Sequence, residues 1–277
     1  MKKYNFSAGP AVLPREVTEK AAASVLNYNN SGFSILEVSH RSKDVVAAMD
    51  QAIALVKELY GLSDEYEVLF LQGGASTQFF QIPMNFLNEE ETAGYINTGA
   101  WSKKAIKDAK AYGKVNVVAS SEEQNFNYIP KNISIPSDLK YLHYTSNNTI
   151  FGTQFQSLPE TDVRLICDMS SDIFSKPIDV SRFDLIYAGA QKNMGPAGVT
   201  LVIVKKSALG TVSRYVPVML DYRTHIENVS MYNTPPVFAM YVSMLTLQWI
   251  KDNGGLEAMA KRNEAKAKIL YDELDRN

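Results

Sequence analysis

Hydrophobic residues recur every three or four positions between residues 44 and 60. They are Val45, Met49, Ile53, Val56 and Tyr60. That spacing gathers side chains on one face of a helix, so the pattern predicts an amphipathic helix in this segment. A fully apolar run follows at residues 68–71 (VLFL), and two glycines end it. Such a run is typical of a buried strand that enters a tight turn.

The same alternation continues along the chain. A helical pattern covers residues 105–112, and further short apolar runs lie at 115–119, 141–144, 164–167, 184–187 and 200–204. Short apolar strands that alternate with helices predict an α/β fold, with a mostly parallel central sheet and helices on both faces. No linker or repeat divides this pattern before about residue 250. From residue 255 onward the chain is highly charged but keeps a helical apolar stripe, which predicts a solvated amphipathic helix.

Composition and charge exclude several classes of function. The 28 basic and 30 acidic residues are nearly balanced, and the absence of a basic run argues against a nucleic-acid partner. The single cysteine, Cys167, excludes a disulfide framework and fits a reducing cytoplasm. The three histidines are too far apart for a short metal motif, so no metal is expected. The start of the chain lacks a secretory apolar stretch, and the apolar segment 238–250 is too short for a membrane span.

Polar residues that directly follow apolar runs are the first candidates for chemistry, because ligands of open α/β sheets bind at the carboxyl ends of the strands. One such segment is residues 72–79 (QGGASTQF). Its glycines permit a close turn, and free N–H groups at the start of the next helix bind phosphate. An ordinary strand-to-helix turn explains this segment better if it stands alone.

Asp168 and Lys192 follow two other predicted strands, so both side chains can face one crevice. A lysine amine forms a Schiff base with an aldehyde cofactor, while a carboxylate keeps a pyridine ring protonated. A loop-capping aspartate and a solvated lysine explain each residue equally well when it is judged separately. Trp101, before a possible helix cap at Ser102, suits stacking on a planar ring or simple packing. Cys167 lies inside an apolar run, which favours a buried, inert thiol.

Six spaced motifs resemble the phosphoserine aminotransferase family of class-V pyridoxal-phosphate enzymes. They are NFSAGP at 5–10, SHRSK at 39–43, QGGAS at 72–76, SNNTIFGT at 146–153, AGAQKN at 188–193 and YNTPP at 232–236. They occur in the family's order from residue 4 to about 255, and six matches together are far more specific than one. The resemblance implies the large domain of fold-type I pyridoxal-phosphate transferases and a homodimer with shared active sites.

The resemblance also implies a role for each matching residue. Lys192 would form the Schiff base, Asp168 would face the pyridine nitrogen, Trp101 would stack on the ring and Thr149 would bond its phenolic oxygen. The phosphate would be held by Ala75, Ser76 and Gln191, together with Asn233 and Thr234 of the other subunit. For Thr234, a place just before a helix that begins near Pro236 is an equally good explanation. His40 and Arg41 would face the anionic substrate.

The reaction implied is reversible amino transfer between L-glutamate and 3-phosphohydroxypyruvate, which gives O-phospho-L-serine and 2-oxoglutarate, with 4-phosphohydroxythreonine of pyridoxine biosynthesis as a further substrate. We expect an N-terminal arm at 1–14, a large cofactor domain at 15–254, and at 255–277 a helix that leads into a small domain absent from this chain. Two alternatives remain: a cofactor-binding dimer with impaired catalysis, and another class-V enzyme such as a cysteine desulfurase, which needs an exposed thiol.

Overall fold

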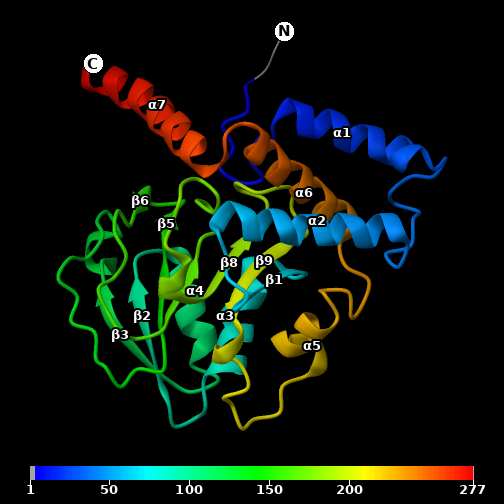
Figure 1. The fold of residues 1–277 in the computed structure, drawn as a ribbon. Helices are drawn as coiled ribbons and strands as arrows, with labels where there is room; N and C mark the ends of the chain where they lie inside the picture. The colour runs from blue at the N-terminus through cyan, green and yellow to red at the C-terminus, as the bar shows by residue number, and fades with distance from the viewer. Residues whose placement is uncertain (1–3, 277) are drawn as a thin grey trace.

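A seven-stranded sheet forms the centre of the computed structural model, which describes residues 4–276 (Figure 1). The strands are β1 Tyr66–Leu71, β2 Thr92–Asn97, β3 Lys114–Ser120, β4 Leu142–Thr145, β5 Asn147–Asn148, β6 Thr153–Gln154, β7 Leu165–Asp168, β8 Phe183–Gly189 and β9 Thr200–Lys205. The α-helices are α1 Arg15–Leu26, α2 Lys43–Tyr60, α3 Gly74–Phe86, α4 Ala100–Ala109, α5 Tyr222–Glu227, α6 Val237–Asp252 and α7 Gly255–Arg276. Short 3-10 helices are η1 Tyr28–Asn30, η2 Glu122–Gln124, η3 Val180–Arg182, η4 Lys206–Ala208 and η5 Val218–Leu220.

The order of the strands in the sheet is β1-β9-β8-β7-β4-β2-β3. From β3 to β8 all neighbours are parallel, and β9 alone runs antiparallel to its neighbours β8 and β1. The carboxyl ends of β1, β2, β4, β7 and β8 therefore lie at one edge of the sheet. β5 and β6 form a separate small hairpin just beyond the end of β4.

The predicted α/β fold with a mostly parallel sheet is confirmed, and so are the strands expected from apolar runs. The prediction omitted β2, whose sequence TAGYIN has too short an apolar run to stand out. The helix expected at 105–112 is α4, which begins five residues earlier at Ala100. The predicted alternation of strands and helices fails between β7 and β8, because that connection contains only the short η3.

Helices cover both faces of the sheet, as the alternating pattern predicts. One face carries a core of Leu69, Tyr95, Ile166, Tyr187 and Val202 beneath α3 and α4. The other face packs against α2 and α6, with α1 and α7 outside them (Figure 1).

The sequence sets the limits of α2 through its two caps. The Ser42 hydroxyl accepts a hydrogen bond from the amide of Val45, which satisfies one of the free N–H groups of the first turn. Gly61 ends the helix in the left-handed conformation, with φ of 60°. Between these caps the stripe of Val45, Met49 and Val56 is buried against the sheet.

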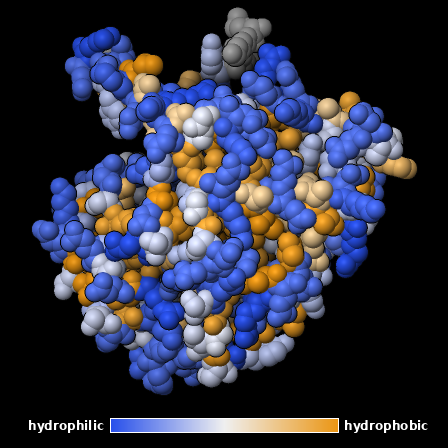
Figure 2. Space-filling view, in the orientation of Figure 1, coloured by the Kyte–Doolittle hydropathy of each residue, from blue (hydrophilic) through white to orange (hydrophobic). Residues whose placement is uncertain are grey.

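Helix α7 extends away from the rest of the molecule (Figure 1), and only its first turns are packed. Figure 2 shows hydrophilic side chains over most of its projecting part. Ile269, Leu270 and Leu274 are nevertheless exposed there, so this part of the predicted apolar stripe has no cover among the described residues. No helix within residues 4–276 has both the length and the apolar character that crossing a bilayer requires.

Candidate active site

The candidate site lies at the edge of the sheet where the parallel strands end. β7 ends at Asp168, and β8 leads directly into the turn that carries Gln191 and Lys192. The Nζ atom of Lys192 donates to Oγ1 of Thr149 at 2.6 Å and lies 5.3 Å from the ring centroid of Trp101. The structure therefore brings together residues that are far apart in sequence: Lys192, Thr149, Trp101 and Asp168.

Asp168 is buried, with only 3% of its surface exposed, and its carboxylate is well supplied with donors. Its Oδ1 atom accepts hydrogen bonds from the Ser170 amide at 2.9 Å and from the Ser170 hydroxyl at 2.6 Å. Burial raises the pKa of Asp168, while the bonds from Ser170 and the positive charge of Lys192 oppose that shift. The carboxylate is thus held in one orientation at the floor of the site.

Burial shifts the pKa of Lys192 in the opposite direction to that of Asp168. It lowers the pKa of the Lys192 ammonium group, and the charges of Asp168 and Asp172 partly offset this effect. Among residues 4–276 Lys192 makes no ion pair with Asp168, although each charge affects the other's pKa. A group that bonds to the amine and also presents a cation to the carboxylate would complete this arrangement.

Trp101 is placed by the start of α4. Ser102, which the sequence suggested as a helix cap, lies inside the helix, and its hydroxyl accepts bonds from the amides of Thr98 and Gly99, each at 3.0 Å. This fixes the first turn and the direction of the indole. The ring has Lys104 Nζ at 4.7 Å from its centroid, and its Nε1 atom is buried without a described partner.

Ala75 and Ser76 lie in the first turn of α3, which is 13 residues long. Gly73 and Gly74 both have positive φ values, 92° and 68°, which residues with a Cβ rarely adopt. At Gly73 an added Cβ would lie 1.9 Å from Thr77 Oγ1 and 2.7 Å from Thr77 Cβ. The conformation that points the first N–H groups of α3 outward therefore requires glycine at this position.

We expect the Gly73→Ala variant to lose roughly 1–3 kcal/mol of unfolding free energy, because it combines backbone strain with a clash that rotation of Thr77 cannot relieve. Urea denaturation measures this loss. Gly32→Ala is the matched control, since Gly32 has φ of 81° but no atom within 4 Å of the added Cβ. Equal stabilities of the two variants would contradict the packing argument.

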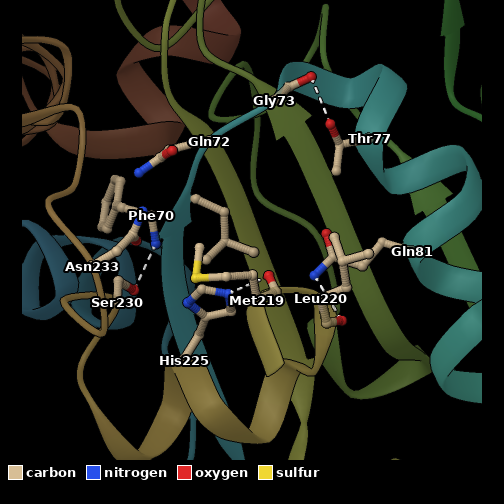
Figure 3. A pocket seen from close by; sticks show the side chains of 11 residues that line it. Phe70, Gln72, Gly73, Thr77, Gln81, Met219, Leu220, His225, Ser230 and Asn233 are labelled. Atoms are coloured by element: carbon tan, nitrogen blue, oxygen red, sulfur yellow. Dashed lines mark hydrogen bonds between the residues drawn. The ribbon is translucent and has the colours of Figure 1, made fainter. Parts of the chain in front are cut away.

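A cavity of about 300 Å³ adjoins this turn, and Lys192 is not among the residues that line it (Figure 3). Gly73 and Thr77 line one wall, and Asn233 and His225 lie across from them. The Gln72 side chain reaches over its edge and donates from Nε2 to the Thr234 carbonyl oxygen at 2.8 Å. The turn at 72–77 is therefore tied to the loop that carries Asn233 and Thr234.

His40 and Arg41 lie apart from Lys192. His40 lines a groove together with Thr234, Pro235 and Ala197, and neither Lys192 nor Asp168 belongs to that groove. The His40 Nε2 atom is buried without a described partner, and Arg41 is exposed. Within this single chain the predicted residues thus form two groups, one around Lys192 and one around Thr234.

The structure adds contacts that the sequence did not identify. The segment before α1 lies against the lysine turn: the Ala11 amide donates to the Gln191 carbonyl oxygen at 2.8 Å, and Gly9 packs against the Lys192 side chain. Ser170 follows Asp168 by two residues, a spacing typical of a local hydrogen bond to a carboxylate. Tyr187 pairs with Asp168 in the β7–β8 register, which the sequence alone does not reveal.

The remaining predictions from the sequence concern Cys167 and metal ions. Cys167 is fully buried in β7, and burial raises the pKa of its thiol well above the usual range, so it is not a reactive nucleophile. The residues that the structure describes include no group of three or more side chains that could hold a metal ion.

The chain matches the class-V aminotransferase family over residues 3–277. It belongs to that family. All of it aligns with the phosphoserine aminotransferase of Flavobacterium psychrophilum, at 60% identity and over 78% of that protein's length. The Bacillus subtilis phosphoserine aminotransferase is 53% identical over 98% of this chain and 76% of its own length. The family resemblance predicted from the six motifs is confirmed.

Two solved structures have the same fold. Phosphoserine aminotransferase from Bacillus circulans subsp. alkalophilus superposes with a TM-score of 0.95 at 49% identity, over 99% of this chain and 77% of that one. A pyridoxal-phosphate-bound phosphoserine aminotransferase from Trichomonas vaginalis gives 0.94 at 41% identity, over 100% of this chain and 78% of that one.

Proposed function

We propose that the chain is a pyridoxal-phosphate-dependent aminotransferase. It transfers the amino group between L-glutamate and 3-phosphohydroxypyruvate, giving O-phospho-L-serine and 2-oxoglutarate in serine biosynthesis. The observation that carries this proposal is the cluster of Lys192, Asp168, Trp101 and Thr149 at one sheet edge, in a chain 60% identical to a phosphoserine aminotransferase. Use of 4-phosphohydroxythreonine in pyridoxine biosynthesis is a further part of the proposal.

The residues present fit pyridoxal phosphate. Lys192 supplies an amine of lowered pKa, Asp168 supplies a buried carboxylate, and the partnerless Nε1 atom of Trp101 marks an indole whose surroundings are incomplete. When bound, the cofactor supplies an aldehyde that condenses with amines and a ring that withdraws electrons. The amides of Ala75 and Ser76 at the start of α3, with the side chain of Gln191, would hold its phosphate.

Each residue of the site then has a defined task. Lys192 would hold the cofactor's aldehyde, and its free amine would move a proton to and from the substrate carbon, a role that its lowered pKa suits. Asp168 would hold the proton of the ring nitrogen. Trp101 would stack on the ring, and Thr149, whose hydroxyl accepts a bond from Lys192 here, would hold the phenolic oxygen. His40 and Arg41 would bind the anionic groups of the substrate.

Addition of L-glutamate alone tests this function. A competent site converts bound pyridoxal phosphate to the amine form and releases 2-oxoglutarate, which a shift of the cofactor's absorbance and product analysis measure. A chain that binds the cofactor but shows no conversion would support the alternative of an impaired cofactor-binding dimer. Conversion by glutamate followed by transfer only to unphosphorylated 2-oxo acids would favour another class-V enzyme.

We further propose that the chain forms a cytoplasmic homodimer with shared active sites, and that residues 1–14 form an arm, 15–254 a cofactor domain and 255–277 the start of a further unit. Two observations support the shared site. His40 and Thr234 line a groove that does not include Lys192, and the exposed Leu36 lines the same groove.

We expect the double variant Asn233→Ala with Thr234→Ala to bind pyridoxal phosphate roughly tenfold more weakly, because two polar contacts to the phosphate are lost. Titration of cofactor fluorescence measures the affinity, and sedimentation with and without cofactor measures dimerisation. A ligand held by both chains strengthens the dimer, so the effect of cofactor on dimerisation should weaken in the double variant. A cofactor-loaded monomer would rule out the shared site.

A further inference from the structure

Behind Asp168 a row of buried polar side chains extends into the core of the sheet. Tyr187 is the register partner of Asp168 on β8, and its hydroxyl group opposes the burial-induced rise in the pKa of the carboxylate. The Tyr187 hydroxyl lies 2.9 Å from Nε2 of His143 on β4. His143 is 2% exposed and Tyr187 fully buried, so this row runs through dry protein beneath α3 and α4.

The proton positions in this row can be assigned. Burial lowers the pKa of His143 to about 3, so the imidazole is neutral and carries one N–H. If Nε2 accepted from Tyr187, the N–H would be on Nδ1, which is buried without a described partner. A buried N–H without an acceptor is rarer than an unused lone pair. His143 therefore donates from Nε2 to the Tyr187 oxygen.

This assignment leaves the single proton of Tyr187 for Asp168. A carboxylate is a stronger acceptor than a neutral imidazole, and bonds to charged acceptors are about twice as strong as neutral ones. Donation from His143 polarises the Tyr187 hydroxyl and makes it a stronger donor toward Asp168, an effect that low dielectric surroundings increase. Tyr95 stacks on the His143 ring at 4.9 Å between centroids and keeps it in place.

We propose that His143 and Tyr187 are positioning residues that act through Asp168, in a chain of donors from His143 Nε2 to Tyr187 Oη to the carboxylate. The chain keeps Asp168 ionised and aimed at the cofactor's ring nitrogen, so that the shared proton stays on the ring. Ser170 holds one carboxylate oxygen from the loop side, and Tyr187 approaches from the sheet side. This inference rests on the proposed use of pyridoxal phosphate.

Nitrogen-15 NMR detects directly whether the ring nitrogen is protonated. The sample is the full chain loaded with pyridoxal phosphate labelled at that nitrogen. In Tyr187→Phe the carboxylate loses a donor and competes more strongly for the proton, so the ring signal moves toward the value of an unprotonated pyridine. His143→Phe keeps the stacking on Tyr95 and gives a smaller shift in the same direction. We also expect kcat to fall about tenfold in Tyr187→Phe, with KM for glutamate nearly unchanged.

Tyr141→Phe is the matched control. Tyr141 is as fully buried as Tyr187 and bonds the Tyr95 hydroxyl at 2.9 Å, but it is outside the row that ends at Asp168. We expect the signal of the cofactor's ring nitrogen and the kcat of Tyr141→Phe to match those of the wild type. Equal signals for wild type, Tyr187→Phe and His143→Phe would overturn the inference, as would an equal shift in all three variants, which indicates a general packing effect.

A second measurement needs no cofactor and separates this inference from the proposed function. Nitrogen-15 spectra of the histidine-labelled chain should show His143 neutral with its proton on Nε2, in the absence of pyridoxal phosphate. A proton on Nδ1 would overturn the direction of the row even if the enzyme were fully active. Failure of the wild-type chain to take up the cofactor, with the Nε2 proton present, would instead count against the proposed function alone.

Discussion

The Lys192→Ala variant is expected to lose the covalent attachment of pyridoxal phosphate and roughly a thousandfold or more of its amino-transfer rate. Both effects follow from one amine that attaches the cofactor and moves the substrate proton. The buried position that lowers the pKa of Lys192 also makes its neutral form more abundant near neutral pH than that of an exposed lysine. Borohydride reduction of the wild-type enzyme, followed by peptide mapping, should place the adduct on Lys192.

Lys104 provides the control for this prediction. Its Nζ atom lies 4.7 Å from the ring centroid of Trp101, on the same indole that Lys192 approaches at 5.3 Å. Lys104→Ala should retain the covalent cofactor and most of the rate, because Lys104 makes no described contact with Thr149 or Asp168. An adduct on Lys104, or on any lysine other than Lys192, would refute the assignment.

Local pattern was enough to predict the central architecture of the fold. The strands β1, β4, β7, β8 and β9 are short apolar runs, and α2 has both a regular stripe and clear caps at Ser42 and Gly61. β2 was missed because glycine and threonine dilute its apolar residues. The reversed direction of β9 is not visible in its own sequence, because a buried strand reads the same whichever way its neighbours run.

The site was predicted in part, and for a different reason at each residue. Asp168 and Lys192 could be proposed because polar residues at strand ends share one edge of a parallel sheet. The contact of Thr149 with Lys192 depends on the turn of the β5–β6 hairpin, and that of Gly9 on the path of the segment before α1. In the sequence Tyr187 and His143 are indistinguishable from other strand residues. The register of the paired strands decides which of their side chains meet, and the sequence does not reveal that register.

The Asp168→Asn variant should lose roughly a hundredfold or more of the amino-transfer rate while it keeps its fold. An amide oxygen can still accept the two bonds from Ser170, so the local loop has no reason to change. A neutral amide cannot hold the proton of the ring nitrogen as a carboxylate does, and the electron-withdrawing power of the ring falls with it. Steady-state kinetics with glutamate measure the loss.

The stability of Asp168→Asn is not expected to fall with its rate. Burial raises the pKa of Asp168 above its unfolded value, so the folded chain binds this proton more tightly, and the ionised carboxylate lowers the unfolding free energy at pH values above that pKa. Replacing it by a neutral amide removes that penalty, so thermal unfolding of Asp168→Asn at neutral pH should occur at the wild-type temperature or higher.

Asp172→Asn separates the loss of this particular carboxylate from the loss of any buried acid. Burial also raises the pKa of Asp172, but its carboxylate is already occupied by the Ser146 hydroxyl at 2.5 Å and the Gln154 amide at 3.2 Å. We expect Asp172→Asn to keep most of the rate. If both variants lost activity equally, or if Asp168→Asn unfolded well below the wild type, Asp168 would be a structural acid and the buried charge would have no role toward the ring.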